Sequence, residues 1–467
     1  MNKARSMFRM FGTSVLVVGG LLALAGMSSA QEADFTEEFR IEECDFSTTG
    51  RNPYFILEPG YRLTLTGEED GEELVLEITV LDETEVVDGV LTRVVEERET
   101  TDGVIAEISR NFFAICTKTN SVFYFGEDVD IYDDEGNLES HEGAWRAGVD
   151  GAQAGVMMPG TILVGSKYYQ EIALDVAMDR AENLSITEDV STPFGDLENC
   201  LKIEETTPVE PDAIDYKYYA PGVGIVQDGD LLLSEVEGLQ VLDLEPFEQE
   251  SNFTEYFMLE TCEFSNTGRN PYFILEPGYR LVFEGEEDGE EILLTITVLD
   301  ETEMVDGVET RIIEEREWVD DVLIEVSRNF FAICTRTNSV FYFGEDVDIY
   351  DDEGNLESHD GAWRAGVDGA RAGLMISGMP LIGSRYSQEV APDIAMDRAE
   401  DLSLTEVVST PAGTFENCLL VKETTPIEPD VEEYKLYAPG IGLVQEGDLQ
   451  LTEYEGHSSV ENWELMR

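Results

Sequence analysis

Apolar and polar residues alternate along most of this chain, which is the pattern of β-strands with one face in a core and one in solvent. The segment ELVLEITVLDET (Glu73–Thr84) carries leucine, isoleucine or valine at every second position from Leu74 to Val80. Asp-Gly turn signals follow at Val87–Gly89 and Thr101–Gly103. Strands joined by such short turns predict an antiparallel meander. The best helix candidate is the short segment Leu174–Glu182.

The pattern occurs twice. GRNPYFILEPGYRL at Gly50–Leu63 returns unchanged at Gly268–Leu281, and this offset of 218 residues holds for aromatic, proline and cysteine positions along nearly the whole chain. The period is far longer than that of a solenoid repeat, and each copy has the size of a domain. We therefore predict two tandem all-β domains with minor helix, residues 31–246 and 247–467, each an antiparallel meander of roughly ten strands in a half-barrel or sandwich.

The first 30 residues have the features of a cleavable signal peptide. Three basic residues precede an apolar run, Phe11–Met27, and the small residues Ser28–Ala30 offer a cleavage site before Gln31. The run is shorter than the roughly 20 apolar residues that a membrane-spanning helix needs. The sequence therefore predicts an exported protein, periplasmic or extracellular, with no transmembrane segment; an uncleaved anchor is the alternative.

The chain is strongly acidic, with 101 Asp and Glu against 28 Lys and Arg and a net charge of −73. Such a field repels nucleic acids and anionic membranes, so neither is an expected partner. Because counterions screen self-repulsion, the surface suits high salt, as in halophilic proteins. The acids are spread over the whole chain, which favours this interpretation over a dedicated binder of polyvalent cations.

Six cysteines fall at matching positions, three in each copy, and none forms a C-x-x-C pair. This excludes a zinc ribbon or thioredoxin-type pair, and an exported chain can form disulfides. We predict bridges Cys44–Cys116 and Cys262–Cys334, which leave Cys200 and Cys418 free or paired across the domains. A bridge between Cys116 and Cys200 is the competing choice.

One acidic stretch in each copy suggests calcium. In FGEDVDIYDDEGNLESHEG three acids occupy positions 1, 3 and 12 of a calcium loop, but a tyrosine stands at position 5 and an aspartate where the turn requires glycine. The alternative is a β-hairpin that turns at Asp134–Asn137. We expect the hairpin, with at most weak surface calcium at Asp128, Asp130, Glu139, Asp346, Asp348 and Glu357.

No catalytic residue can be assigned from the sequence. Each copy holds one histidine at an equivalent position, His141 or His359, and a third, His457, lies near the C-terminus. There is no G-x-S-x-G elbow for a nucleophilic serine. Carboxylates occur everywhere and therefore point to no particular site. The expectation is a non-enzymatic binding or cell-envelope protein without a cofactor other than calcium. The alternatives are an extracellular hydrolase that uses carboxylates and a purely structural envelope component.

A set of motifs carries a resemblance. NPYF-x-L-x-PG, YFGED, GAWRAGVDGA and KYYAPG-x-G-x-V begin in the first copy at Asn52, Tyr124, Gly143 and Lys217. Together they resemble a family of exported bacterial proteins of unknown function, whose domains are similar to the half-barrel of periplasmic lipoprotein carriers. The resemblance implies a curved antiparallel sheet and carries no function of its own. By analogy with the carriers a hydrophobic small ligand is one expected partner; an envelope component and cations are the alternatives. The residues expected to line the site, or else only to plug the sheet, are Tyr54, Phe55, Tyr272 and Phe273.

Overall fold

The computed structural model describes residues 35–69, 71–238, 247, 252–287 and 289–456. The chain divides into two compact units, Asp34–Asn252 with Leu381–Gly383, and Phe253–Pro380 with the chain from Ser384 onward. We call them copy 1 and copy 2. The division lies close to the predicted boundary between residues 246 and 247. The predicted signal peptide, residues 1–30, lies outside the described residues.

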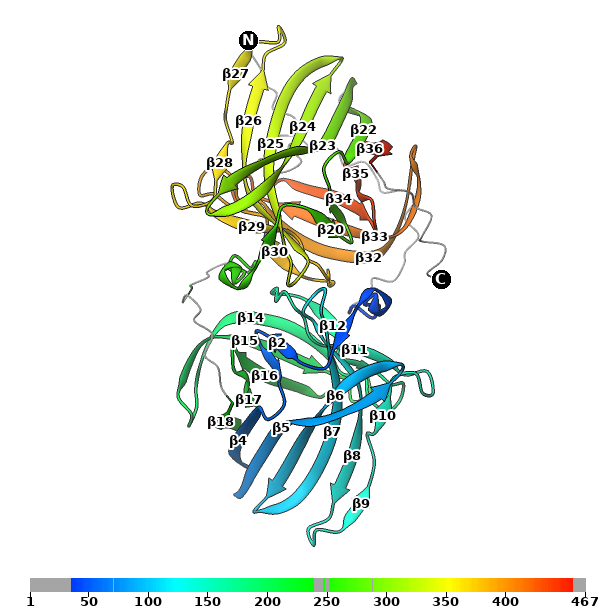
Figure 1. The fold of residues 1–467 in the computed structure, drawn as a ribbon, viewed down its shortest axis with the longest axis vertical. Coiled ribbons are helices and arrows are strands. Elements are labelled where there is room, and N and C mark those ends of the chain that lie inside the picture. The colour runs from blue at the N-terminus through cyan, green and yellow to red at the C-terminus, as the bar shows by residue number, and fades with distance from the viewer. Residues whose placement is uncertain (1–34, 70, 239–246, 248–251, 288, 457–467) are drawn as a thin grey trace. The chain divides into compact units, whose positions relative to one another are not determined.

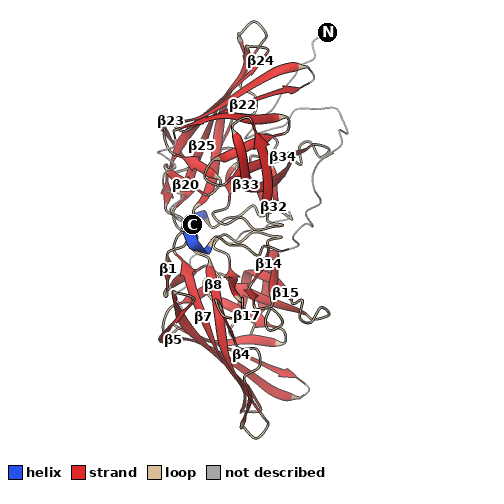
Figure 2. Ribbon diagram, turned by 90° about the vertical axis from the view of Figure 1, so that its right-hand side faces the viewer, coloured by secondary structure: helices blue, strands red, loops and turns tan. Residues whose placement is uncertain are grey.

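Strands make up most of each copy (Figures 1 and 2). Those of copy 1 are β1 (Phe46–Ser47), β2 (Gly50–Asn52), β3 (Phe55–Leu57), β4 (Arg62–Glu69), β5 (Glu72–Val87), β6 (Val90–Thr101), β7 (Val104–Cys116), β8 (Val122–Tyr132), β9 (Leu138–Ser140), β10 (Trp145–Arg146), β11 (Gln153–Met158), β12 (Lys167–Tyr169), β13 (Glu171–Ile172), β14 (Arg180–Ser191), β15 (Asp196–Thr206), β16 (Ile214–Ala220), β17 (Gly224–Asp228) and β18 (Leu231–Glu237).

Copy 2 repeats the same series. Its strands are β19 (Phe264–Ser265), β20 (Gly268–Asn270), β21 (Phe273–Leu275), β22 (Arg280–Glu287), β23 (Glu290–Val305), β24 (Val308–Val319), β25 (Val322–Cys334), β26 (Ser339–Tyr350), β27 (Leu356–Ser358), β28 (Trp363–Arg364), β29 (Arg371–Ile376), β30 (Arg385–Ser387), β31 (Glu389–Val390), β32 (Arg398–Thr410), β33 (Gly413–Thr424), β34 (Glu432–Ala438), β35 (Gly442–Glu446) and β36 (Leu449–Glu455). A single-turn 3₁₀ helix precedes the first strand of each copy, at Ile41–Glu43 and Leu259–Thr261.

Each copy forms one curved antiparallel sheet that nearly closes into a barrel. In copy 1 the order is β12-β14-β15-β16-β17-β18-β4-β5-β6-β7-β8-β11-β13, so neighbours in sequence pair almost throughout. The pairing of β18 with β4 joins the last strand of the copy to its first long strand. The prediction of two tandem all-β meanders is therefore confirmed, and the curvature goes further than a half-barrel.

A single short segment brings the two free edges of the copy 1 sheet together. Its first half, β12, pairs with β14, and its second half, β13, pairs with β11. The change of partner occurs at Gln170, whose backbone passes directly over Gly155 of β11: a Cβ built on that glycine would lie 2.4 Å from the Gln170 carbonyl carbon. Only a residue without a side chain allows the two backbones to approach so closely.

The core of each copy is rich in aromatic rings, which are buried on both faces of the sheet. In copy 1, Phe46 meets Phe123 and Phe125 edge to face, with ring centroids 5.5 Å and 5.4 Å apart. Phe113 stacks on Tyr124 at 4.7 Å. Such contacts stabilise a core beyond the area that they bury. Because Phe123, Tyr124 and Phe125 are successive residues of β8, the rings of Phe123 and Phe125 lie on one face of the sheet and the ring of Tyr124 lies on the other.

Two local predictions were wrong. Leu174–Glu182 is not a helix: Leu174 is 74 % exposed in a turn, and β14 begins at Arg180. Its alanine, leucine and methionine favour a helix weakly, and pairing with the sheet overrides that preference. The estimate of roughly ten strands per copy was too low, because short strands of two or three residues, such as β1, β9 and β10, accompany the long ones.

Within the described chain, no helix has the length and apolar character needed to cross a membrane.

Candidate functional site

The repeated motif forms a small hairpin separate from the main sheet. In copy 1, β2 and β3 pair only with each other. Asn52 holds the hairpin in place: its side-chain amide donates to the carbonyls of Asn120 (3.0 Å) and Pro159 (2.7 Å), and its carbonyl oxygen accepts from the Tyr54 backbone N–H (2.9 Å). The hairpin thus presents Tyr54 and Phe55 to the inside of the barrel.

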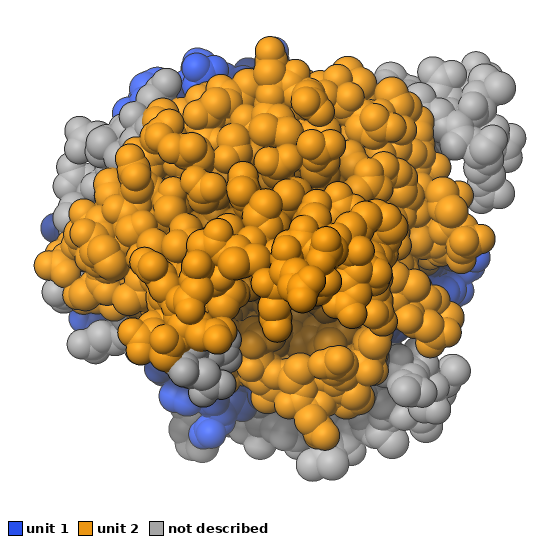
Figure 3. All heavy atoms as spheres, turned by 90° about the horizontal axis from the view of Figure 1, so that it is seen from below, with its two compact units in different colours: residues 1–33, 253–380, 384–467 blue, residues 34–252, 381–383 orange. Residues whose placement is uncertain are grey.

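A cavity lies behind this hairpin in copy 1. The space between its side chains has an empty volume of about 640 Å³, including the part open to solvent. Figure 3 shows copy 1 in orange, and its surface is hollowed in this view. Apolar side chains from β3 to β6 and from β17 form most of the wall; they include Phe55, Leu63, Leu76, Ile78, Val80, Val95 and Ile225.

Charged residues line part of the same wall. Glu97 of β6, Lys217 of β16 and Asp228 of β17 all face the cavity. The Lys217 Nζ lies 2.8 Å from Glu205 Oε2 and 3.9 Å from Asp228 Oδ2. Lys217 therefore forms a short ion pair with Glu205 and a longer, weaker one with Asp228. The side chain of Glu97 makes no hydrogen bond with the described residues.

Burial changes the acidity of these groups. Desolvation raises the pKa of Glu97 to about 7, against which Lys217 acts only partly. Burial also raises the pKa of Asp228, again partly offset by Lys217. Burial acts to lower the pKa of Lys217, but the carboxylates of Glu205 and Asp228 outweigh it and hold that pKa well above its usual range. The lysine is therefore charged near neutral pH, and Glu97 titrates there.

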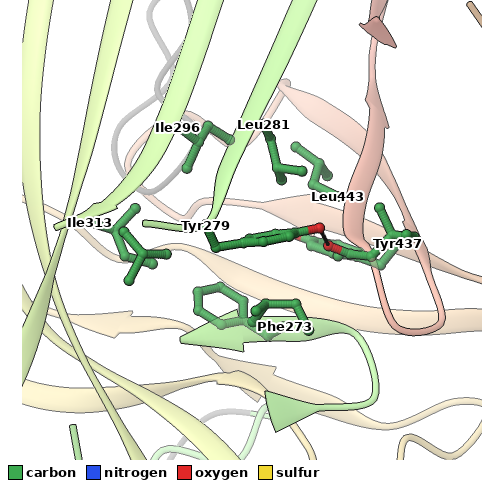
Figure 4. Close-up of a pocket in the computed structure, with 11 residues that line it drawn as sticks. Phe273, Tyr279, Leu281, Ile296, Ile313, Tyr437 and Leu443 are labelled. Carbon is green, nitrogen blue, oxygen red and sulfur yellow. Dashed lines mark hydrogen bonds between the residues drawn. The ribbon is translucent and has the colours of Figure 1, made fainter. Parts of the chain in front are cut away.

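Copy 2 has a smaller cavity at the equivalent place, with an empty volume of about 440 Å³. Figure 4 shows Tyr279 extended across it, with Leu281 and Ile296 on one side of the ring and Phe273 on the other. The Tyr279 hydroxyl donates to the Ile441 carbonyl at 2.8 Å. Tyr437 and Leu443 complete a wall that contains no charged side chain among the described residues.

Three of the four predicted lining residues face a cavity. Tyr54 and Phe55 line that of copy 1, and Phe273 lines that of copy 2. Tyr272 does not belong to the wall of the copy 2 cavity; its hydroxyl donates to the Asn417 carbonyl at 3.2 Å.

The acidic stretch of each copy is the expected hairpin. In copy 1, Asp133 Oδ1 accepts the Asn137 N–H at 2.8 Å and closes the turn between β8 and β9. Asp128 lies 2.8 Å from Arg146, and Asp130 lies 2.8 Å from His141 Nδ1. The same pairs recur in copy 2. No group of three or more potential metal ligands occurs within the described residues, so weak calcium binding stays a prediction.

Both predicted disulfides are present. Cys44 is bonded to Cys116 at the end of β7, and Cys262 to Cys334 at the end of β25. Each ties the segment before the first strand to a central strand, as predicted. Cys200 and Cys418 are free and buried. Burial raises the pKa of the Cys418 thiol to about 11, which keeps it in the unreactive protonated form.

The sequence interpretation missed the charged part of the wall. Alternate residues of a strand face the same side, so Glu97 of β6 lies on the same face as the buried Val95. This alternation could have predicted that Glu97 points inward. No such signal exists for Asp228. A bulge pairs Tyr218 with Gln227 but Tyr219 with Ile225, and this extra residue turns Ile225 and Asp228 to the same side of β17.

Comparison with protein-family models, with curated proteins and with solved structures finds no match for this chain.

Proposed function

We propose that this protein is an exported, non-enzymatic binding protein that holds a small apolar molecule inside each barrel. The observation that carries the proposal is the cavity on the concave face of each sheet, walled mainly by aromatic and branched aliphatic side chains. Small-molecule sites are typically concave and mostly apolar, with a few polar groups that orient the ligand.

Two further features support this function. Disulfides within each copy suit an oxidising compartment outside the cytoplasm. The duplication gives one chain two sites, which doubles its binding capacity.

Binding of the neutral fluorophore N-phenyl-1-naphthylamine to the full-length secreted chain tests the proposal. We expect saturable fluorescence enhancement with two sites. The double variant Ile225→Phe/Leu443→Phe places a ring in each cavity and should abolish it. The matched control Val209→Phe/Ile427→Phe adds the same bulk at equivalent exposed positions, 46 % and 40 % accessible, and should bind like the wild type.

Circular dichroism and thermal unfolding establish that both double variants are folded. A wild-type chain that gives no saturable signal would overturn the proposal, as would a folded cavity variant that binds as well as the control. Native mass spectrometry of protein purified from its source should in addition show a bound mass of small-molecule size.

A further inference from the structure

The two cavities differ in volume and in the charge of their walls, although the sequences that form them are nearly the same. Of the residues that form the copy 1 wall, most are identical at the equivalent positions of copy 2. The exceptions are Val95, Val223, Ile225 and Asp228, which correspond to Ile313, Ile441, Leu443 and Glu446. Three of these changes keep the residue apolar, and two of them add a methylene that fills space in copy 2.

The fourth change acts on the lysine. In copy 2, Glu446 is one methylene longer than Asp228 and brings Oε1 to 3.2 Å from Lys435 Nζ, while Glu423 Oε2 lies 2.6 Å away on the same amine. The lysine is thereby held between two carboxylates. In copy 1 the shorter Asp228 stays 3.9 Å from Lys217, so among the described residues Glu205, at 2.8 Å, is the only carboxylate within hydrogen-bond distance of this amine.

The lysine and its carboxylate partner are also more exposed to solvent in copy 1 than in copy 2. The Lys217 side chain is 24 % accessible and that of Asp228 29 %, whereas Lys435 and Glu446 are 1 % and 2 % accessible. The copy 1 cavity therefore reaches its charged residues, and the copy 2 cavity does not.

The charge facing the copy 1 cavity is negative. One amine, Lys217, is shared between Glu205 at 2.8 Å and Asp228 at 3.9 Å. With Glu97 ionised, three carboxylates stand against this single positive charge, so the group carries a negative excess. Carboxylates in a partly desolvated site bind a protonated amine through charge-assisted hydrogen bonds, and they disfavour an anion.

We infer that the two copies have different ligands: copy 1 takes an apolar molecule that carries a protonated amine, and copy 2 takes a smaller, uncharged apolar molecule. This inference rests on the proposed function. It assigns Glu97 and Asp228 as the residues that select the amine, and it makes the protein a binder of two chemical classes.

Displacement of N-phenyl-1-naphthylamine by decylamine, decan-1-ol and decanoate tests the inference at pH 7.5. The Leu443→Phe variant reports copy 1 alone, and Ile225→Phe reports copy 2 alone. In copy 1 decylamine should displace the probe at about tenfold lower concentration than decanol, with decanoate the weakest. In copy 2 decylamine should show no advantage.

Adding Asp228→Asn to the copy 1 reporter should remove most of the decylamine preference and leave decanol unchanged. Asp228→Glu, which carries the residue of copy 2, gives a second variant with the charge retained, and it should also reduce the preference. Glu446→Gln in the copy 2 reporter is the matched control and should change neither competitor.

Equal preference in both copies, or a preference that survives both Asp228 substitutions, would overturn the inference while the probe still binds, so the proposed function would stand. Absence of probe binding in both reporters would overturn the proposed function and this inference together.

Discussion

At the scale of single residues, Asn52 holds the hairpin that forms part of the cavity wall. It is fully buried, and its amide joins three backbone groups from segments far apart in the sequence. Asn270 repeats the arrangement in copy 2, with bonds of 2.8 Å and 2.9 Å to the Asn338 and Ser377 carbonyls. Buried polar groups are costly without partners, so this amide specifies where the hairpin docks.

Replacing Asn52 by alanine should therefore destabilise copy 1 by about 2–4 kcal/mol, because it leaves buried backbone groups without their partner. Differential scanning calorimetry should show the transition of one copy lowered and the other unchanged, and Asn270→Ala should lower the other transition. Asn137→Ala, in an exposed turn, is the control with an expected effect below about 1 kcal/mol. An unshifted transition in Asn52→Ala would show that the hairpin docks without this amide.

At the scale of elements, the near-closure of each barrel depends on a short segment that changes partner. In copy 1 this segment contains β12 and β13, and Gln170 lies at the change. Its side-chain amide donates to Glu205 at 2.8 Å, so the closing segment also orients the carboxylate that pairs with Lys217. The hydrogen bond from Gln170 to Glu205 therefore connects the segment that closes the sheet with the charged residues of the cavity.

The substitution Gly155→Ala should open this closure. The new methyl group would overlap the Gln170 backbone, which cannot move aside as a flexible side chain could. We expect a loss of about 2–4 kcal/mol in urea unfolding, by the overpacking that such contacts cause. Gly60→Ala is the comparison: its φ of 86° costs about 1 kcal/mol, but its surroundings are open. If the two variants are equally stable, close approach at Gly155 has no special role.

At the scale of the whole molecule, buried carboxylates set the response to pH. Burial raises the pKa of Glu97, Glu127 and Glu446 to about 7. A carboxyl whose pKa is higher in the folded state than in the unfolded chain stabilises the fold fully below its unfolded pKa, near 4.5, and this contribution is lost as the pH rises through about 7. Acidification within this window should therefore stabilise the protein.

We expect the free energy of unfolding to rise from pH 8 to pH 5, by up to about 1.4 kcal/mol per pH unit for each such group. Glu97→Gln removes one titrating group, so it should flatten the profile between pH 5 and 7 and increase stability at pH 8. Urea titrations at a series of pH values, at constant ionic strength, measure both effects. Glu139→Gln, on the exposed face of the acidic hairpin, is the control. A profile of Glu97→Gln parallel to that of the wild type would contradict the assignment.

Much of the architecture could be predicted because its signals are local or repeated. Alternation with a period of two identifies strands wherever one face is buried, and Asp-Gly turns separate them. Comparison of the two copies located the domains and grouped the cysteines, and the bridge from Cys44 to Cys116 was predicted and is present. The helix expected at Leu174–Glu182 failed for the complementary reason, since only the sheet decides whether a weak local preference survives.

By itself, then, the sequence determined the all-β class and the tandem duplication, because these follow from periodicity and repetition. It limited the cysteine pairing to a few choices, and the structure decided between them. The tertiary structure alone decided that the sheet curls almost into a barrel and that Glu97, Lys217 and Asp228 meet in one cavity. Glu97 lies on β6, far in sequence from Lys217 and Asp228 on the neighbouring strands β16 and β17. A bulge in β17 also changes the alternation that would otherwise indicate the face of Asp228. Glu97 comes close to Lys217 and Asp228 only when the sheet curves, and the net charge that faces a ligand depends on these distances.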